Sequence, residues 1–538
     1  MKFLSNSKKR KTVVKIIAIV LAALFILATF ASVLPAIVGA EDYSYSDGPL
    51  IRVGIYYGAS AVSSIAFTSA SGFEIGVTDS THTLFTALVS TDLTALVAQI
   101  SEGASEISVL TPEWEQIYAH SDASNPLCIR AKGANAPITA AGNTYNGYIE
   151  LAYSGGKIRM VSVAYLEDYV RGVVAAEVYS SWPAEALKSQ AVVARTYTLH
   201  TAGKHSADGF DICSTQHCQA YKGVGAATES INSAVESTKG LIVTYGGKPA
   251  LTTYHSSSGD TTESATSAWG GAPEQYPYLS VVNVGFNECE NYTNGKWSYT
   301  VGASELYDYI NSKEDYAGIL KGPVESIKCE RLGDSEYVNT LTVSDAYGNE
   351  IVVKKSATVR NFLTQYCKSA CFTISTQCPV YAGENENYIL DSQNMYVISA
   401  DGGKSLSAPS SAATGIEALT SSGLKSVVPT GERIFTISGE GYGHGVGLSQ
   451  YGSMTLAERG HDFRYILGLY YPGTEIADCK TITGYNFIVK NGFGVSESVF
   501  LFNTNTFFRH GTLLYRFRLI SCRLYLQISK KYIKNKKL

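Results

Sequence analysis

The sequence predicts a mixed α+β fold in which strands dominate and a few helices carry the candidate chemistry. Short apolar runs alternate with Gly, Ser, Thr and Asn over most of the chain, a pattern typical of strands and turns. Two segments instead place apolar residues three and four positions apart, which is typical of helices. The chain has 538 residues and is 45% hydrophobic, so it is long and apolar enough to build packed cores.

The first forty residues indicate export. A basic stretch, 8–15, precedes an apolar stretch, 16–34. A signal peptide carries an apolar core of roughly 7–15 residues and a membrane span takes about 20, so the stretch fits an uncleaved anchor slightly better. The small residues Val38, Gly39 and Ala40 nevertheless offer a cleavage site. We expect residues 1–40 to be a signal peptide or membrane anchor, with the rest of the chain extracytoplasmic.

The remainder divides into three predicted parts. Residues 41–130 form a small strand-rich extracytoplasmic module, with one helix around Leu93 to Ile100. Residues 135–480 form the strand-rich domain that carries the candidate site. Ser405 to Thr430, rich in Ser, Ala and Gly, is predicted to be a long surface loop. Residues 481–538 are a basic tail to which we assign no fold.

A hairpin followed by two helices opens the candidate-site domain. The runs 148–153 and 158–163 are joined by a Gly-Gly turn, which indicates two antiparallel strands. Apolar spacing then predicts a helix over Leu166 to Val178. Pro183 opens a second, longer helix, because a proline at the first helical position loses no hydrogen bond, and Gly203 closes it.

Glu177 is the strongest candidate for a catalytic group. At helical spacing it shares a face with Val170 and Val173, so its carboxylate lies against apolar surface. Desolvation raises the pKa of such a carboxyl group, which then holds a proton that it can deliver to a leaving oxygen. The alternative is that Glu177 ends the helix facing water, or pairs with Arg171 or Arg195.

Five further residues are candidates for contacting a substrate: Gln190, Arg195, His444, Gln450 and Tyr451. The first two interrupt an apolar helix pattern, although polar residues on a helix are usually its solvated side. The other three belong to the Gly-rich segment 441–452, where glycines let the backbone approach a ligand closely. The histidine could touch substrate, serve as a second proton carrier or be structural. The Ser and His residues of 254–259 resemble a nucleophile set only by composition.

Four metal-ligating side chains follow the second helix: His205, Cys213, His217 and Cys218. Two imidazoles and two thiols are a full tetrahedral zinc set, and a closed set of four is structural rather than catalytic. The alternative is a disulfide between the two cysteines, with unrelated histidines. In an exported protein the nearby cysteines of 367–378 could likewise form local bridges. The formal net charge of −4 provides no global basic field for binding nucleic acid, so we expect no such partner.

The chain resembles a known family over roughly Pro137 to Lys480. Four motifs carry the resemblance, in order: 146–151 (NGYIEL), 166–177 (LEDYVRGVVAAE), 187–197 (LKSQAVVARTY) and 443–452 (GHGVGLSQYG). They are similar to motifs of stage II sporulation protein D and of the amidase enhancers that share its domain.

The resemblance implies a peptidoglycan lytic transglycosylase that acts on glycan strands already stripped of stem peptides, with Glu177 as the catalytic acid. It further implies that the His and Cys cluster holds zinc, which the chemistry itself does not need. Glycan strands and a cell-wall amidase are the implied partners. The alternatives are a non-catalytic enhancer or scaffold of an amidase, and a zinc-dependent amidase.

The chain departs from the usual family pattern beside the catalytic glutamate. Ala175 and Tyr179 replace prolines that are common there, and Ser189 stands where alanine is usual. None of these changes removes a required group, but the loop after Glu177 is expected to differ. The module 41–130 and the basic tail lie outside the resemblance.

Overall fold

The computed structural model describes residues 48–482, except for gaps at 80, 83–84, 123–124, 134–135, 291, 293, 382–386, 392–395, 400–401, 406–415, 421–422 and 430–431. Between 378 and 431 only backbone is described. The chain divides into two compact units, 1–491 and 492–538, and the second lies wholly outside the described residues. The predicted signal or anchor and nearly all of the basic tail also lie outside them. No helix among the described residues is long and apolar enough to cross a bilayer.

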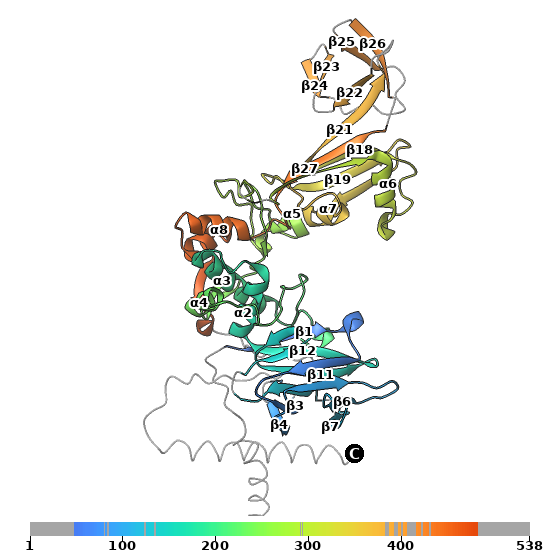
Figure 1. The fold of residues 1–538 in the computed structure, drawn as a ribbon. Helices are drawn as coiled ribbons and strands as arrows, with labels where there is room; N and C mark the ends of the chain where they lie inside the picture. The colour runs from blue at the N-terminus through green and yellow to red at the C-terminus, as the bar shows by residue number, and fades with distance from the viewer. Residues whose placement is uncertain are drawn as a thin grey trace, which may run out of the picture. The chain divides into compact units, whose positions relative to one another are not determined.

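The first part of the fold is a seven-stranded sheet (Figure 1). In spatial order its strands are β13 (Ile212–Cys213), β1 (Leu50–Tyr56), β12 (Lys157–Tyr165), β11 (Tyr148–Ser154), β8 (Leu127–Ala131), β3 (Phe73–Thr78) and β4 (Phe85–Thr91). All neighbours are antiparallel except β1 and β13. The hairpin predicted at 148–163 is confirmed, and its turn uses Gly155 and Gly156 at φ 58° and 81°.

A second, six-stranded antiparallel sheet shares a hydrophobic core with the first. Its strands are β10 (Asn143–Tyr145), β9 (Ile138–Ala140), β2 (Ser64–Thr68), β5 (Ala95–Gln99), β6 (Ile107–Leu110) and β7 (Gln116–His120). The prediction of a helix around Leu93 to Ile100 is wrong, because this segment contains β5. Its residues alternate between buried and half-buried, and it pairs with β2 and β6. The run was too short for apolar spacing alone to separate helix from strand.

Both sheets combine strands from before and after residue 131. In the first sheet β1 pairs with β12, and in the second β2 pairs with β9. Side chains from both stretches fill one core. The expected boundary between 41–130 and 135–480 therefore does not coincide with a break in the sheets or in the core.

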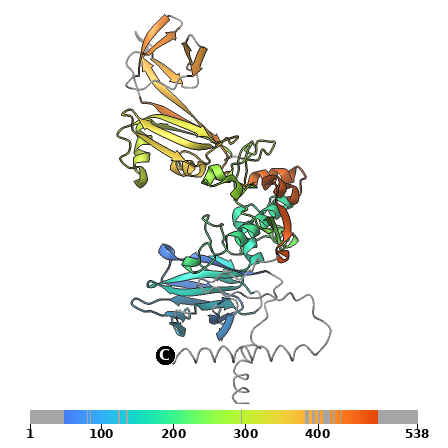
Figure 2. The same ribbon diagram turned by 180° about the vertical axis from the view of Figure 1, so that it is seen from behind.

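Three helices follow the first sheet and contact one another, as Figures 1 and 2 show: α2 (Leu166–Glu177), α3 (Ala184–Thr201) and α4 (Glu229–Ser237). The two predicted helices are confirmed within two residues at each end. Pro183 is the cap residue rather than the first helical residue of α3, and Gly203, at φ 87°, follows its end. Twelve of the eighteen residues of α3 are buried, so α3 is a core helix rather than an amphipathic one.

A third core forms where segments from much later in the chain pack against α3. Its helices and strands are β14 (Leu241–Tyr245), β15 (Lys248–Pro249), β16 (Tyr254–His255), α5 (Ala265–Trp269), β28 (Leu448–Ser449), α8 (Gln450–Glu458), α9 (Phe463–Tyr470) and β29 (Glu475–Asp478). The parallel pair β16 and β28 joins 254–255 to 448–449. This pairing places the start of α8 beside the segment that follows β15.

Residues 296–440 form a strand-rich part with its own core. Its helices and strands are β17 (Lys296–Gly302), α6 (Ala303–Asn311), β18 (Val324–Arg331), β19 (Val338–Asp345), β20 (Glu350–Lys354), α7 (Ser356–Phe362), β21 (Phe372–Tyr381), β22 (Asn387–Asp391), β23 (Tyr396–Ser399), β24 (Gly402–Ser405), β25 (Ile416–Thr420), β26 (Gly423–Pro429) and β27 (Ile434–Glu440). The long loop predicted at 405–430 is wrong over 416–429, where β25 and β26 form an antiparallel hairpin. The high Ser and Gly content of this segment had indicated a loop, although its residues form a short hairpin. The predicted strand-dominated α+β class is confirmed.

Candidate active site

Helix α2 ends at Glu177, and this end of the helix forms the centre of the candidate site. Seven residues of α2 are buried, so the helix is held by its apolar face against the first core. The Glu177 side chain is half-buried. The backbone N–H of Ala220 donates a hydrogen bond of 2.8 Å to its Oε1. The Tyr254 hydroxyl and the Gln450 amide also hydrogen-bond the carboxyl group.

The environment of Glu177 favours a protonated acid. Burial raises its pKa above the ordinary value, and this effect outweighs the three hydrogen bonds, each of which lowers the pKa. The alternative partners are occupied elsewhere: Arg171 pairs with Asp168 and Glu236, and Arg195 pairs with Glu167. Among the described residues no cation pairs with Glu177. The predicted direction of the shift is therefore confirmed.

A buried polar network lies behind the Tyr254 hydroxyl. Gln219 donates from Nε2 to the Tyr254 oxygen at 3.3 Å. Its Oε1 accepts from the Thr198 hydroxyl at 2.9 Å and from the Tyr169 hydroxyl at 3.3 Å. Because Gln219 is fixed by α2 and α3 together, Tyr254 has a defined position beside the carboxyl group. We did not predict Gln219, Ala220 or Tyr254, since their proximity to Glu177 depends on contacts between distant segments.

Gln450 and Gln190 meet at the same place. The Gln450 amide donates to the Glu177 carbonyl oxygen at 3.4 Å and to Gln190 Oε1 at 3.5 Å. Gln190 is 1% exposed and its Nε2 has no partner among the described residues. Of the two, Gln450 is the one that contacts Glu177, and Gln190 lies behind it.

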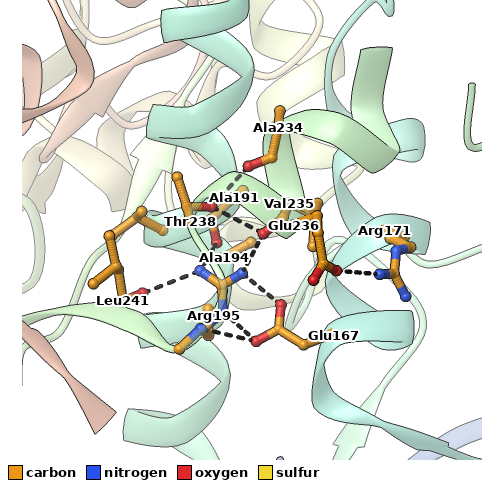
Figure 3. A network of polar contacts seen from close by, with 12 residues as sticks. Glu167, Arg171, Ala191, Ala194, Arg195, Ala234, Val235, Glu236, Thr238 and Leu241 are labelled. Carbon is orange, nitrogen blue, oxygen red and sulfur yellow. Dashed lines mark hydrogen bonds and ion pairs between the residues drawn. The ribbon is translucent and has the colours of Figure 1, made fainter. Parts of the chain in front are cut away.

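Arg195 was predicted to contact a substrate, and the structure contradicts this prediction. Its guanidinium is fully buried and makes a bidentate ion pair with Glu167, at 2.9 and 2.6 Å (Figure 3). It also donates to the carbonyl oxygen of Leu241 at 3.0 Å. Arg195 therefore ties α3 to α2 and β14 inside the protein, where a polysaccharide cannot reach it.

The described contacts of His444 do not include the Glu177 carboxyl group, although His444 hydrogen-bonds the backbone of Tyr254. Its Nδ1 accepts a hydrogen bond from the Val446 N–H at 3.0 Å, and its ring packs edge-on against Trp269 and beside His255. Desolvation lowers the pKa of His444 to about 4. The imidazole is thus neutral near pH 7. Among the described residues its ring neighbours are Trp269 and His255 rather than Glu177.

Tyr451 begins a group of aromatic rings at the start of α8. It stacks on Tyr292 with 3.8 Å between ring centroids and meets Trp182 edge-on at 5.1 Å. Tyr451 directly follows Gln450, whose amide donates to the backbone carbonyl oxygen of Glu177.

The four predicted metal ligands converge. Their ligand atoms all lie within 4.8 Å of one another. His217 Nδ1 is 3.1 Å from His205 Nε2, 3.6 Å from the Cys213 sulfur and 3.8 Å from the Cys218 sulfur. Adjacent ligand atoms in a tetrahedral zinc site with two nitrogens and two sulfurs stand about 3.3–3.8 Å apart. The four side chains fit a zinc ion.

The chemistry of this cluster also fits a metal. Both cysteines are unpaired thiols, which disfavours the alternative disulfide. Cys218 donates a hydrogen bond to the Cys213 sulfur, which lowers the pKa of Cys213 to about 3 and raises the pKa of Cys218. His205 Nδ1 contacts the Asp208 carboxylate at 2.8 Å, a carboxylate–histidine arrangement common at metal sites. Cys367 and Cys371 are also unpaired, and the Cys378 side chain lies outside the described residues.

The cysteine cluster and the carboxyl group belong to one continuous segment. Strand β13, which contains Cys213, lies against β1. The Asp211 N–H donates to the Arg52 carbonyl oxygen, and the Arg52 N–H donates to the Asp211 carboxylate. Cys218 is followed directly by Gln219 and Ala220, which contact Tyr254 and Glu177. A metal bound at the cluster would therefore fix the segment that donates to Glu177.

A surface cavity of about 770 Å³ lies beside α2 and α4 but contains none of the predicted site residues. Its charged lining includes Asp168, Arg171 and Glu236, and these side chains pair with one another. Because its only cation is already paired within the protein, we assign the cavity no chemistry.

The family model described as Stage II sporulation protein (SpoIID) matches residues 154–245. This stretch contains Glu177, α2, α3 and the whole His and Cys cluster. Over this stretch the chain resembles the family of stage II sporulation protein D and the amidase enhancers, in agreement with the four motifs.

Three relatives are similar to this chain. The protein named Amidase enhancer, from Bacillus subtilis (strain 168), is 28% identical over 319 residues, which cover 57% of this chain and 40% of that protein. Stage II sporulation protein D of the same strain is 26% identical over 328 residues, covering 58% and 74%. Stage II sporulation protein D of Bacillus amyloliquefaciens is 36% identical over 132 residues, covering 22% and 38%. The match therefore spans less than half the length of the first relative.

Proposed function

We propose that this protein is a peptidoglycan lytic transglycosylase with Glu177 as its catalytic acid. The observation that carries the proposal is a half-buried carboxyl group whose pKa is raised by desolvation and which has no cation partner among the described residues. Such a group holds a proton when others have lost theirs, and it can pass that proton to the oxygen that leaves when a glycosidic bond breaks.

The proposed reaction uses the same carboxyl group twice. Glu177 protonates the oxygen between N-acetylmuramic acid and N-acetylglucosamine, and the bond from that oxygen to C1 of the muramic sugar breaks. The C6 hydroxyl of the same sugar then bonds to C1 and returns its proton to the Glu177 carboxylate. The ring closes as a 1,6-anhydro end, no water is consumed, and the acid is regenerated.

A single acid suits this reaction better than hydrolysis. Hydrolytic glycosidases use two carboxyl groups, the second as nucleophile or water activator. Among the described residues no second carboxylate contacts Glu177. The buried Glu288 is saturated by Ser258, Ser449 and Tyr470, so it stabilises the start of α8 instead.

The His and Cys cluster is proposed to hold a structural zinc. Zinc bound by four protein ligands supplies a rigid crosslink, whereas catalytic zinc keeps an open position for water. His205, Cys213, His217 and Cys218 would complete such a set. This supports a crosslink beside the site rather than a zinc-dependent amidase. In the proposal the chain acts outside the cytoplasmic membrane, on glycan strands freed of peptides, in sporulation or cell-wall remodelling.

Removing the metal is expected to destabilise the protein and to slow glycan cleavage, because the segment that carries Ala220 loses its crosslink. The purified protein should contain one zinc per chain by elemental analysis, and a chelator should lower its Tm. The Cys218→Ser variant should behave like the chelated protein, whereas Cys329→Ser, outside the cluster, should keep its zinc. Protein free of metal, with a Tm insensitive to chelator, would contradict this assignment.

Replacing Tyr254 with Phe is expected to move the pH dependence of cleavage upward. The Tyr254 hydroxyl lowers the pKa of Glu177, so its removal raises that pKa further. Since the protonated acid is the active form, activity falls as the pH rises through its pKa, and in the variant this fall occurs at higher pH. Rate profiles measure the shift, with the exposed Tyr245→Phe as control. A profile that stays in place or moves downward would show that Tyr254 does not act on Glu177.

A non-catalytic amidase enhancer is the second candidate, favoured by the name of one relative. Product analysis separates the classes. Purified protein incubated with peptide-free glycan should release fragments lighter by one water than hydrolytic products. Free stem peptides with intact glycan would indicate an amidase. Protein that leaves every glycan intact yet stimulates an amidase would favour the enhancer and overturn the proposal.

A further inference from the structure

Four aromatic rings from three separate segments form a continuous row beside Glu177. Tyr179 and Trp182 stand between α2 and α3, with their ring centroids 6.0 Å apart. Trp182 meets Tyr451 at 5.1 Å, and Tyr451 stacks on Tyr292 at 3.8 Å. The row starts two residues after Glu177, and its third ring follows Gln450, whose amide contacts Glu177.

Backbone hydrogen bonds hold the segments that carry Tyr179, Trp182 and Tyr451. The N–H of Trp182 donates to the Tyr179 carbonyl oxygen at 3.0 Å, which closes a turn, and Trp182 packs against the first core. The loop is also clamped by the Ser230 hydroxyl, which donates to the Ser180 carbonyl oxygen at 2.8 Å. The N–H of Tyr451 donates to the Ser256 carbonyl oxygen at 3.0 Å. These three rings are therefore preorganised, which reduces the entropy lost when a ligand binds.

Tyr179, at one end of the row, is more exposed to solvent than a side chain that stabilises the core would be. Tyr179 is 66% exposed, although it is large and apolar, and it stands where the family pattern commonly has proline. An aromatic ring in this position adds little to a core. Ring faces carry negative charge density, and one face of a pyranose presents weakly positive C–H groups, so sugars stack on aromatic rings.

We propose that Tyr179, Trp182, Tyr292 and Tyr451 form a stacking subsite for the pyranose rings of a glycan strand. This inference rests on the proposed function and specifies how the strand is held while Glu177 acts. The row extends from the acid over several rings, so it contacts sugars that flank the scissile bond rather than the reacting atoms. Its contacts with these sugars hold the strand in line with Glu177.

The subsite is tested by measuring the binding of purified peptide-free glycan strands. The Glu177→Gln variant serves as the parent protein, because it should bind the strands without cleaving them. Adding Tyr179→Ala should weaken binding about ten-fold by calorimetry, an effect of the size found when one aromatic ring that stacks on a nucleic-acid base is removed. Tyr179→Phe, which keeps the ring, should bind nearly as well as the parent. Tyr347→Ala removes a distant tyrosine that is 74% exposed and should leave binding unchanged. In the active protein, Tyr179→Ala should raise KM with little change in kcat.

Three outcomes would overturn the subsite. The first is that the parent and the Tyr179→Ala variant bind glycan with equal affinity. The second is that the Tyr347→Ala control loses as much glycan affinity as the Tyr179→Ala variant. The third is a Tyr179→Ala variant that binds glycan normally but no longer stimulates an amidase, which would make the row a protein-docking surface. Failure of the proposed function is distinguishable, because the wild-type protein would then leave glycan intact.

Discussion

The Glu177→Gln variant is expected to form anhydro ends about 10²–10⁴-fold more slowly than the wild type, the usual contribution of a general acid. The amide has nearly the same shape and can still accept the hydrogen bond from the Ala220 N–H, but it has no transferable proton. The second half of the proposed reaction needs a carboxylate as base. None of the other described groups that contact Glu177 is a carboxylate, so none can replace it. Initial rates on peptide-free glycan, followed by mass spectrometry, measure the effect.

The same variant has an expected effect on stability that serves as its folding control. Because burial raises the folded-state pKa of Glu177 above its unfolded value, ionisation weakens the fold as the pH rises between those two values. A permanently neutral Gln avoids this loss, so the variant should have the higher Tm at neutral pH, with the difference vanishing below the unfolded pKa. The exposed Glu229→Gln should leave both rate and Tm unchanged. Wild-type activity in a folded Glu177→Gln protein would exclude Glu177 as the acid.

The second large effect is on folding. Replacing Arg195 with Met is expected to cost about 3–5 kcal/mol of unfolding free energy, since it leaves the Glu167 carboxylate buried without its partner. Denaturant unfolding of the purified protein measures the loss. The double variant Arg195→Met with Glu167→Met should recover much of it, because both charges are then removed together. The exposed Lys222→Met controls for the loss of one positive charge.

An Arg195→Met protein that is as stable as the wild type but has lost glycan binding would contradict this account of Arg195. Such a result would return the residue to the substrate site, where its place in the sequence first suggested it. The burial of its guanidinium, at 0% exposed, and its bidentate contact with Glu167 predict the opposite. Variants at this position therefore lose activity by unfolding and not by losing a contact to sugar.

Features encoded by neighbouring residues could be predicted from the sequence. The hairpin over 148–163 and the helices α2 and α3 follow from alternation and apolar spacing. The apolar surroundings of Glu177 also follow from its own helix, and the four candidate metal ligands lie within one short segment. In each case the residues that determine the feature lie within a few turns of one helix or within one loop.

Features that depend on contacts between distant segments could not be predicted. Spacing put Arg195 on a helix but did not reveal that Glu167 neutralises it inside the core. Tyr254 stood in a segment noted only for its Ser and His content, and the pairing of β16 with β28 is what brings it beside Gln450. The strand at 95–99 and the hairpin at 416–429 were missed because short runs take their conformation from the strands they pair with.

Cleavage of peptide-free glycan in water enriched in heavy oxygen tests the central claim most directly. If Glu177 alone drives an intramolecular ring closure, the wild-type protein should produce anhydro ends that contain no solvent oxygen, and the Glu177→Gln variant should produce almost none. Products that carry one heavy oxygen at each new end would mean that water attacks the sugar. That result would contradict a one-acid transglycosylase and require a second catalytic group.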